Sequence, residues 1–409
     1  MIDVDRHIKY YWERLLGSVD VEERFVDPNC AEHCMRASTF LKYLDLEPLM
    51  PVLNKYYKVK EDEETYPRRA MFKALLWRRI KGLKWYTKLH KELITHPEEA
   101  KELGFKEEAG EIAIPSARSL NHFEGTRLGL DGLNELFTAL SKLVVKKGKT
   151  LGMEIGRQTT VDSIPIETVA NDSEGVWNEH YKLKMAKLHV VADLKENIPL
   201  SKAISSGTSG DGEQFTQLYN DAKTIVGERV MEEMWFDGSY TSNEILAWMH
   251  TEGIRAYYHI TTSWNLVSFK HCYRGRFYYF SPEQEIEWQY QKLWKKPYFK
   301  RDCTLEYKMK CLITEGINEP VAMFYRNARL LEYEESPEGV LEVYNVRASH
   351  REGFHGYLKE QYHLEQHNSK GLKQLDRHLT GTLVTVLAVA LTRLQQGISQ
   401  NLISIAHLT

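Results

Sequence analysis

The sequence predicts a mixed α/β protein, in which a helical N-terminal region precedes a mixed sheet that helices flank and a β-rich insertion interrupts. Three observations predict this class. Apolar residues follow helical spacing up to residue 150, β-rich and helical stretches alternate from residue 157, and an aromatic-rich segment fills residues 264–343. Of the 409 residues, 42% are hydrophobic and 27% charged, which allows a sizeable core and is too apolar for a disordered chain.

The N-terminal region, residues 1–150, has apolar residues at three- and four-residue spacing, the period of a helix with one buried face. Two such runs are Ala70–Ile80 and Leu133–Leu143, and Pro115 and Ser116 can start another helix between them. A helix-turn-helix and simple core packing are both open here. Strand signals are nearly absent, so we expect an all-helical region.

Residues 151–263 alternate between strand-like and helical stretches. Three β-rich runs come first, namely QTTVDSI, KLHVVADL and PLSKAISS. A helical stretch at 213–226, the strand-like MEEMWF, a helix at 242–250 and the strand-like IRAYYHI follow. The predicted order is therefore three antiparallel strands, helix, strand, helix, strand.

The remaining chain divides into an insertion and a pair of helices. Residues 264–343 contain short strand-like runs rich in Tyr, Phe and Trp, such as GRFYYFS and LEYKMKCLIT, so we expect a β-rich insertion there. Residues 344–409 have helical patterns at 346–366 and 372–394. The second pattern is apolar around most of its circumference, which predicts a buried helix.

Charge and simple motifs narrow the classes of function. The formal net charge is −3, which argues mildly against a nucleic-acid-binding protein, yet Lys and Arg cluster locally at 68–91. No G-x-x-x-x-G-K-S/T phosphate loop occurs, so an ATP-driven activity is disfavoured. No signal peptide and no apolar stretch of about 18 residues occurs, so we expect a cytoplasmic protein without membrane contact.

Three acids are distinguished by their places in these elements. Asp162 ends an apolar strand-like run, Asp237 follows another and precedes a glycine, and Glu352 lies on the first C-terminal helix. A single acid of this kind is usually a turn or capping residue. Three in this order can hold divalent ions, because Mg²⁺ prefers hard oxygen ligands. Two such ions can activate the attacking oxygen and stabilise the leaving oxygen of a phosphoryl displacement.

With these acids in place, the sequence resembles the DDE transposases of prokaryotic insertion sequences, specifically the group with a Tyr-Arg-Glu-Lys signature. Tyr344, Arg347, Glu352 and Lys359 match that signature with one extra residue before Glu352, which leaves Arg351 as an alternative to Arg347. The segments YPRRAMFKALLWRRIKGLKWYTKLHKEL and HYKLKMAKLHVVADLKENIPL also resemble this family. The resemblance implies an RNase H-like catalytic core, with the third acid on a late helix after a β insertion.

The resemblance also implies an activity, a cofactor and partners. Asp162, Asp237 and Glu352 would bind two Mg²⁺ ions, which Mn²⁺ can replace. Water would attack a phosphodiester at the transposon end, and the freed 3′-hydroxyl would attack a second one. The partners would be terminal inverted repeats and target DNA, bound at the nucleoid by a homodimer on paired ends. A catalytically silent DNA-binding protein derived from a transposase and a structure-selective nuclease of the same fold remain as alternatives.

Further residues are candidate DNA contacts. Residues 1–150 would bind the DNA ends, and the signature implies backbone contacts from Tyr344, Lys359 and one of Arg347 and Arg351. The basic cluster adds Arg68, Arg69, Arg78 and Arg79. Trp264 and Trp294 could stack on bases, with packing inside the insertion as the alternative.

Three more polar residues fall near the predicted cleft. His189, Asp193 and Asp211 could each contribute to a metal site. The simpler interpretations are a satisfied sheet residue, a turn residue and a loop cap, respectively.

Overall fold

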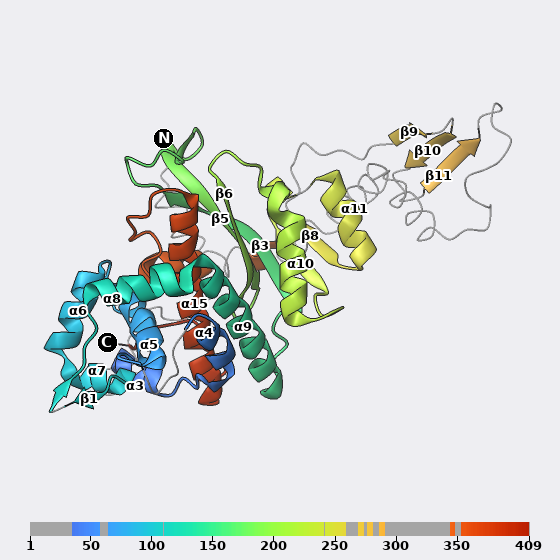
Figure 1. Cartoon of the computed structure of the whole chain (residues 1–409). Coiled ribbons are helices and arrows are strands. Elements are labelled where there is room, and N and C mark those ends of the chain that lie inside the picture. The colour runs from blue at the N-terminus through green and yellow to red at the C-terminus, as the bar shows by residue number, and fades with distance from the viewer. Residues whose placement is uncertain are drawn as a thin grey trace, which may run out of the picture.

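The computed structural model describes most of the N-terminal and sheet regions and the C-terminal helices (Figure 1). The described residues are 35–57, 64–108, 110–240, 242–258, 269–273, 276–280, 286–290, 344–347 and 353–408.

Helices build the N-terminal region, as its apolar spacing predicts. They are α3 (Ala37–Lys42), η2 (Glu47–Leu49), α4 (Met50–Lys55), α5 (Arg68–Ile80), α6 (Tyr86–Thr95), α7 (Pro97–Leu103), α8 (Ala117–His122), the π-helical η4 (Phe123–Leu128) and α9 (Gly129–Thr150). A two-residue hairpin of β1 (Glu107–Glu108) and β2 (Glu111–Ile112) is the departure from the all-helical expectation.

The predicted start of α8 is confirmed. The Ser116 hydroxyl accepts a hydrogen bond of 3.1 Å from the backbone N–H of Ser119, which caps the helix. From there α8, η4 and α9 follow one another without an intervening loop, but the backbone leaves the helical conformation at Gly129, whose φ is +59°.

A mixed sheet follows, and its elements have the predicted order. The strands and helices are β3 (Gln158–Glu167), β4 (Val176–Asn178), β5 (Leu183–Asp193), β6 (Pro199–Ser206), η5 (Asp211–Gln214), α10 (Phe215–Val226), β7 (Glu233–Phe236), η6 (Gly238–Tyr240), α11 (Asn243–Glu252) and β8 (Arg255–Tyr258). In space the order is β6–β5–β3–β7–β8. β5 runs antiparallel to both of its neighbours, whereas β3, β7 and β8 are parallel. The short β4, which pairs with the beginning of β5, was not predicted.

Helices cover both faces of this sheet. On β6 the Ser201 hydroxyl donates a hydrogen bond to the carbonyl of Leu218 on α10. The next residue, Lys202, forms an ion pair with Asp376 on the C-terminal helix α15 (Leu372–Gln395). Because adjacent residues of a strand point to opposite faces, α10 and α15 lie on opposite sides of the sheet. The mixed sheet, its flanking helices and the helical N-terminal region confirm the predicted fold class.

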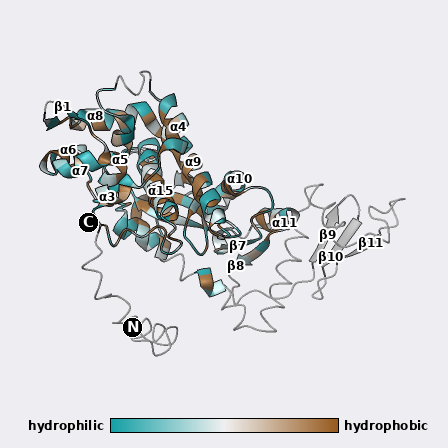
Figure 2. Cartoon of the chain, turned by 90° about the horizontal axis from the view of Figure 1, so that it is seen from below, coloured by the Kyte–Doolittle hydropathy of each residue, from teal (hydrophilic) through white to brown (hydrophobic). Residues whose placement is uncertain are grey.

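The C-terminal helices differ from each other in how well the sequence predicts them. α15 is buried around its whole circumference from Leu379 to Leu394, as its apolar composition predicts (Figure 2). The predicted helix at 346–366 is shorter, because its described residues end in the π-helical η7 (Tyr357–Gln361). His363 then has a φ of +52°, a left-handed conformation that stops a helix.

Three strands lie within the predicted β-rich insertion. β9 (Phe269–Tyr273), β10 (Arg276–Phe280) and β11 (Ile286–Tyr290) form an antiparallel sheet of their own, in the order β11–β10–β9. β10 corresponds to the predicted GRFYYFS, while LEYKMKCLIT lies outside the described residues. None of the helices that the structure describes has both the length and the apolar character to cross a membrane.

Candidate active site

Asp162 lies in the middle of β3, whereas the sequence suggested a strand end. The strand that ends beside Asp162 is the neighbouring β7. β7 pairs with β3 only along Gln158–Thr160, so β3 continues past the carboxyl end of β7. Thr160 is opposite Trp235, and two residues further along Asp162 comes level with Asp237. Since neighbouring strands are about 4.8 Å apart, the backbones of the two acids lie side by side at the end of β7.

The strand register also assigns Asp162 to one face of the sheet. Asp162 pairs with Val190, which in turn pairs with Lys202, and Lys202 points toward α15. Residues directly opposite each other across strands share a face. Asp162 is therefore on the α15 side, and the adjacent Ser163 is on the α10 side.

Arg347 reaches Asp162 from a distant part of the sequence. Its Nη2 lies 2.9 Å from Oδ2 of Asp162, and both side chains are only 13% exposed. Its Nη1 donates a longer hydrogen bond of 3.4 Å to the hydroxyl of Tyr344, whose pKa burial raises. One signature residue, Arg347, therefore contacts the first predicted acid, and a second, Tyr344, contacts Arg347. The alternative arginine, Arg351, lies outside the described residues.

Asp237 is the first residue after β7, and the chain turns there into η6. Its Oδ1 accepts a hydrogen bond of 2.7 Å from the backbone N–H of Ser239 and another from the Ser239 hydroxyl. A methyl group added at Gly238 would meet nothing within 4 Å. Gly238 is itself exposed, and Asp237 is half-buried.

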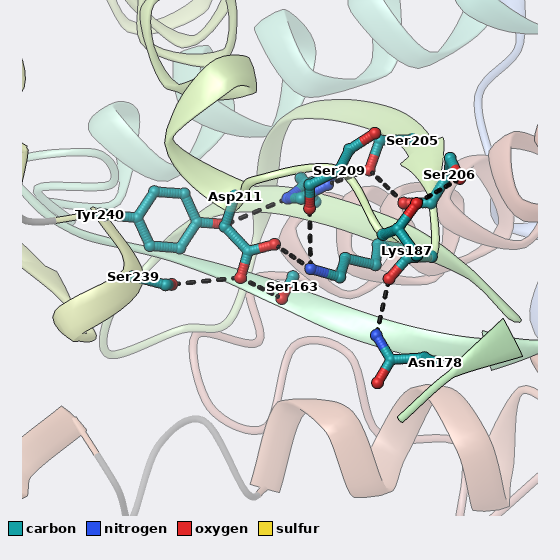
Figure 3. Close-up of polar contacts among 12 residues, drawn as sticks. Ser163, Asn178, Lys187, Ser205, Ser206, Ser209, Asp211, Ser239 and Tyr240 are labelled. Carbon is teal, nitrogen blue, oxygen red and sulfur yellow. Dashed lines mark hydrogen bonds and ion pairs between the residues drawn. The ribbon is translucent and has the colours of Figure 1, made fainter. Parts of the chain in front are cut away.

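A third acid, Asp211, links the two strands from the α10 side (Figure 3). Its Oδ2 accepts hydrogen bonds of 3.1 Å from the hydroxyls of Ser163 and Ser239. Ser163 follows Asp162 in the chain, and Ser239 holds Asp237. Asp211 thus fixes the spacing of the two segments that carry the predicted acids.

Lys187 neutralises Asp211. Its Nζ lies 2.7 Å from Oδ1 of Asp211 and 3.0 Å from the carbonyl of Ser209 (Figure 3). Burial alone would raise the pKa of Asp211, but the hydrogen bond and charge of Lys187 outweigh it and lower that pKa. The interpretation of Asp211 as a loop cap missed this pair. The sequence did contain one sign of a polar group on this face. Lys187 and His189 are two residues apart on one strand, so both side chains point to the α10 face, where Asp211 lies.

His189 and Asp193 have the simpler roles that were considered for them. The His189 ring nitrogens lie 3.1 Å from the Tyr240 hydroxyl and 2.7 Å from the Ser205 hydroxyl, and burial lowers its pKa to about 4. It is a satisfied sheet residue that stays neutral. Asp193 accepts backbone hydrogen bonds from Gly156 and Glu196, at 2.8 and 2.7 Å, and is a turn residue.

The buried Tyr240 feels the charges of several of these groups. Burial raises its pKa well above the usual value, and the charges of Asp211 and Asp237 raise it further, while Arg347 lowers it. Arg347 in turn contacts Asp162. Asp211, Asp237 and Arg347 therefore lie close enough to Tyr240 for their charges to act on it, and Arg347 connects this group to Asp162.

Several predicted site residues cannot be placed. Glu352, Arg351, Trp264 and Trp294 lie outside the described residues. Lys359 lies in η7 and forms an ion pair of 2.8 Å with Glu365. Glu352 and Lys359 are seven residues apart, a separation that puts two side chains on one face of an α-helix, and the π-helical η7 departs from that periodicity.

The predicted DNA contacts of α5 need correction. The side chains of Arg68, Arg78 and Arg79 are only 4%, 8% and 6% exposed. Arg68 pairs with Glu64, and the other two pair with Glu124. A guanidinium buried against a carboxylate does not reach a DNA phosphate, so the expectation is wrong for these three. Arg69 differs, because its pair with Glu47, at 2.8 Å, is at the surface.

The donor set at the end of β7 suits a hard divalent cation. Asp162 and Asp237 offer carboxylate oxygens, the ligands that Mg²⁺ prefers. Asp211 is a poor ligand, because Lys187 neutralises it and it approaches from the opposite face of the sheet. Elsewhere in the described chain, His96, Glu98 and Glu99 have ligand atoms within 4.8 Å of one another. There Glu99 accepts hydrogen bonds from Ser38 and Trp77, so this group holds helices together.

A comparison with known families agrees with this geometry. A model of the transposase DDE domain matches residues 156–387, which is more than half of the chain and runs from just before β3 into α15. No curated protein and no solved structure matches the sequence. The matched range contains Asp162, Asp237 and Glu352, and it establishes that the chain belongs to the family of transposases with a DDE domain.

Proposed function

We propose that this chain is an active transposase that cuts and rejoins DNA at the ends of an insertion sequence. The observation that carries the proposal is that Asp162 on β3 comes level with Asp237, which directly follows the parallel neighbouring strand β7, with Arg347 against Asp162. Two acids at this spacing supply two of the three carboxylates of a site for in-line phosphoryl displacement. A protein that only binds DNA has no need of such a pair.

Asp162, Asp237 and Glu352 would hold two Mg²⁺ ions, for which Mn²⁺ can substitute. When bound, such ions supply activation of the attacking oxygen and stabilisation of the leaving oxygen. Glu352 is five residues beyond Arg347 in the sequence. Because Arg347 contacts Asp162, its segment starts at the site, which supports Glu352 as the third acid.

The protein's own side chains divide the remaining work. In the absence of DNA, Arg347 orients Asp162, and in a complex with DNA its guanidinium can donate hydrogen bonds to a phosphate. The Tyr344 hydroxyl, held neutral by its raised pKa, can donate a hydrogen bond to a phosphate near the cut. Lys359 and Arg69 form surface pairs that a phosphate can replace at small cost. These roles are those expected of the group with the Tyr-Arg-Glu-Lys signature, and we propose that the chain belongs to it, with Arg351 as a further backbone contact.

We also propose a division of labour along the chain. Residues 1–150 bind the terminal inverted repeats, and residues 151–263 with 344–409 form the catalytic core around the insertion at 264–343. Trp264 and Trp294 would stack on bases there. Two copies act together on paired ends and then on target DNA in the nucleoid.

A cleavage assay tests this function. Purified full-length protein is incubated with Mg²⁺, or with EDTA, and a duplex that carries the inverted repeats flanking its own gene. We expect metal-dependent nicking that leaves a 3′-hydroxyl, followed by joining of that end to a second duplex.

The two alternatives give different products in the same assay. Binding of the repeats without any nicking identifies a silent DNA-binding protein. Nicking of branched or flapped DNA without joining identifies a structure-selective nuclease. Either result contradicts the proposal.

A further inference from the structure

A basic groove lies between the N-terminal helices and the first turns of α15. It has a volume of about 700 Å³ and is lined by residues from the start of α6, from α8 and from 366–378. We call it the Trp85 groove, defined by Lys84, Trp85, Arg118, Lys370 and Arg377 among its lining residues. None of these five was singled out as a candidate site residue from the sequence.

The Trp85 groove is lined by more cationic than anionic side chains. Within the part of the chain that the structure describes, Lys84, Arg118, Lys370 and Arg377 have no carboxylate partner. The acid among the lining residues is Glu124, which is buried and already paired with Arg78 and Arg79. Asp172 and Glu174 lie beside Lys370, because they accept hydrogen bonds from the backbone N–H groups of Gly371 and Leu372. The remaining cations, Lys84, Arg118 and Arg377, form no ion pair within the described residues, and such a group suits a polyanion.

An aromatic side chain stands among these cations. Trp85 is 48% exposed, and Nζ of Lys84 lies 5.3 Å from its ring centre. The exposed amides of Asn121 and Gln374 line the same groove. Cations and hydrogen-bonding amides match the phosphates of a DNA backbone, and the exposed indole can pack against its sugars.

The groove is connected to the strand that carries Asp162. A ring nitrogen of His367, one of its lining residues, lies 3.0 Å from the carbonyl of Glu167 at the end of β3. Asp162 is five residues earlier on that strand, a separation of about 17 Å at about 3.3 Å per residue. Along duplex DNA, this length corresponds to about five base pairs. α15, which begins at the groove, also covers the Asp162 face of the sheet.

We propose that the Trp85 groove binds the backbone of duplex DNA about five base pairs from the bond that is cut at Asp162 and Asp237. The inference rests on the proposed function for the position of the cut, and on charge and shape for the binding. The contacts are to phosphates, so the groove holds DNA of any sequence and sets the register of the cut.

The test measures binding without cleavage. A fluorescein-labelled duplex of random sequence is titrated with the full-length protein at several salt concentrations, and anisotropy gives the affinity. The variant is Arg118→Ala with Lys370→Ala. The matched control is Lys42→Ala with Lys106→Ala, which removes the same charge from two exposed lysines outside the groove.

Two lost phosphate contacts should give a measurable change. The slope of log K against log salt should become shallower by about 1.8, and affinity at about 0.1 M salt should fall about 60-fold, or about eightfold per contact. The control should keep the parent's slope. Equal slopes and affinities for the groove variant and the control would overturn the proposal.

Cleavage of a terminal-repeat duplex separates this proposal from the proposed function. If the salt dependence of binding is shallower for the groove variant but the parent never nicks DNA, DNA binding by the groove is supported and the transposase activity is contradicted. If the groove variant binds DNA like the parent and both proteins nick it, the transposase activity is supported and DNA binding by the groove is contradicted.

Discussion

Glu124 is the centre of a buried charge network, and Glu124→Gln should destabilise the fold strongly. Its carboxylate accepts hydrogen bonds from Arg78 at 3.2 Å, Arg79 at 2.5 Å and the Tyr86 hydroxyl at 2.7 Å. The carboxylate side chain is only 3% exposed. The substitution keeps the shape but leaves two guanidinium groups buried together without a counter-charge.

The expected cost follows from that burial. Removal of one partner from a buried ion pair costs about 3–5 kcal/mol, because the remaining charge stays desolvated. Burial alone would raise the pKa of Glu124, but Arg79 and Arg78 outweigh it and hold that pKa far below its ordinary value. Its stabilising contribution is therefore complete above the ordinary pKa of about 4.3 and is lost as the pH falls below it. The difference between parent and variant should shrink in acid.

Urea unfolding followed by circular dichroism measures the effect, and Glu135→Gln is the matched control. Glu135 also accepts hydrogen bonds from a cation and a tyrosine, Lys55 at 2.5 Å and Tyr56 at 2.8 Å, but this group is exposed. Exposed pairs contribute little, so the control should remain close to the parent. Equal costs for the two substitutions at pH 7 would refute the reasoning.

Three further predictions concern the sheet, α15 and the site. Because burial lowers the pKa of His189 to about 4, up to about 3 kcal/mol of stability should be lost as the pH falls from 6.5 toward 4, and His189→Gln should reduce that slope in thermal unfolding. Gly381→Ala should lower the free energy of unfolding in urea by about 1–3 kcal/mol, because the added methyl would overlap the guanidinium of Arg79. Gly397→Ala, where the methyl meets no neighbour but φ is positive, is a comparison without crowding. Arg347→Lys cannot bridge Asp162 and Tyr344 as a fork, so nicking should fall about tenfold or more with an unchanged circular dichroism spectrum; a wild-type rate would contradict that role.

Periodicity was sufficient to predict the sheet and its helices. β6 coincides with PLSKAISS, and α10, α11 and β8 lie within or beside the stretches expected for them. These elements have one buried face, and burial imposes a period on the sequence. β4 and the β1–β2 hairpin were missed because two or three residues are too few to show a period.

Only part of the candidate site could be predicted from the sequence. Asp162 and Asp237 were found from their settings next to apolar runs, but their register depends on where β7 stops pairing with β3. Lys187 and Asp211 form an ion pair although they are 24 residues apart in the sequence, and no local sequence pattern predicts a contact between residues so far apart.

The basic run of α5 shows the limit of charge patterns. Arg68, Arg78 and Arg79 look like a solvated or DNA-facing cluster, but Glu64 and Glu124 bring carboxylates to them in the core. Of the cations of the Trp85 groove, Lys84 belongs to the basic cluster at 68–91, whereas Arg118, Lys370 and Arg377 are dispersed and form no run. Only the packing of α6, α8 and α15 brings them together.

The most direct test of the central claim is the single-turnover rate of Mg²⁺-dependent nicking for Asp162→Asn and Asp237→Asn at saturating protein. Asp131→Asn, at an exposed position in the first turn of α9, serves as the control. The proposed site predicts that both site variants bind the terminal-repeat duplex like the parent but do not nick it, while the control nicks at the parental rate. Nicking by either site variant at the parental rate would contradict the assignment.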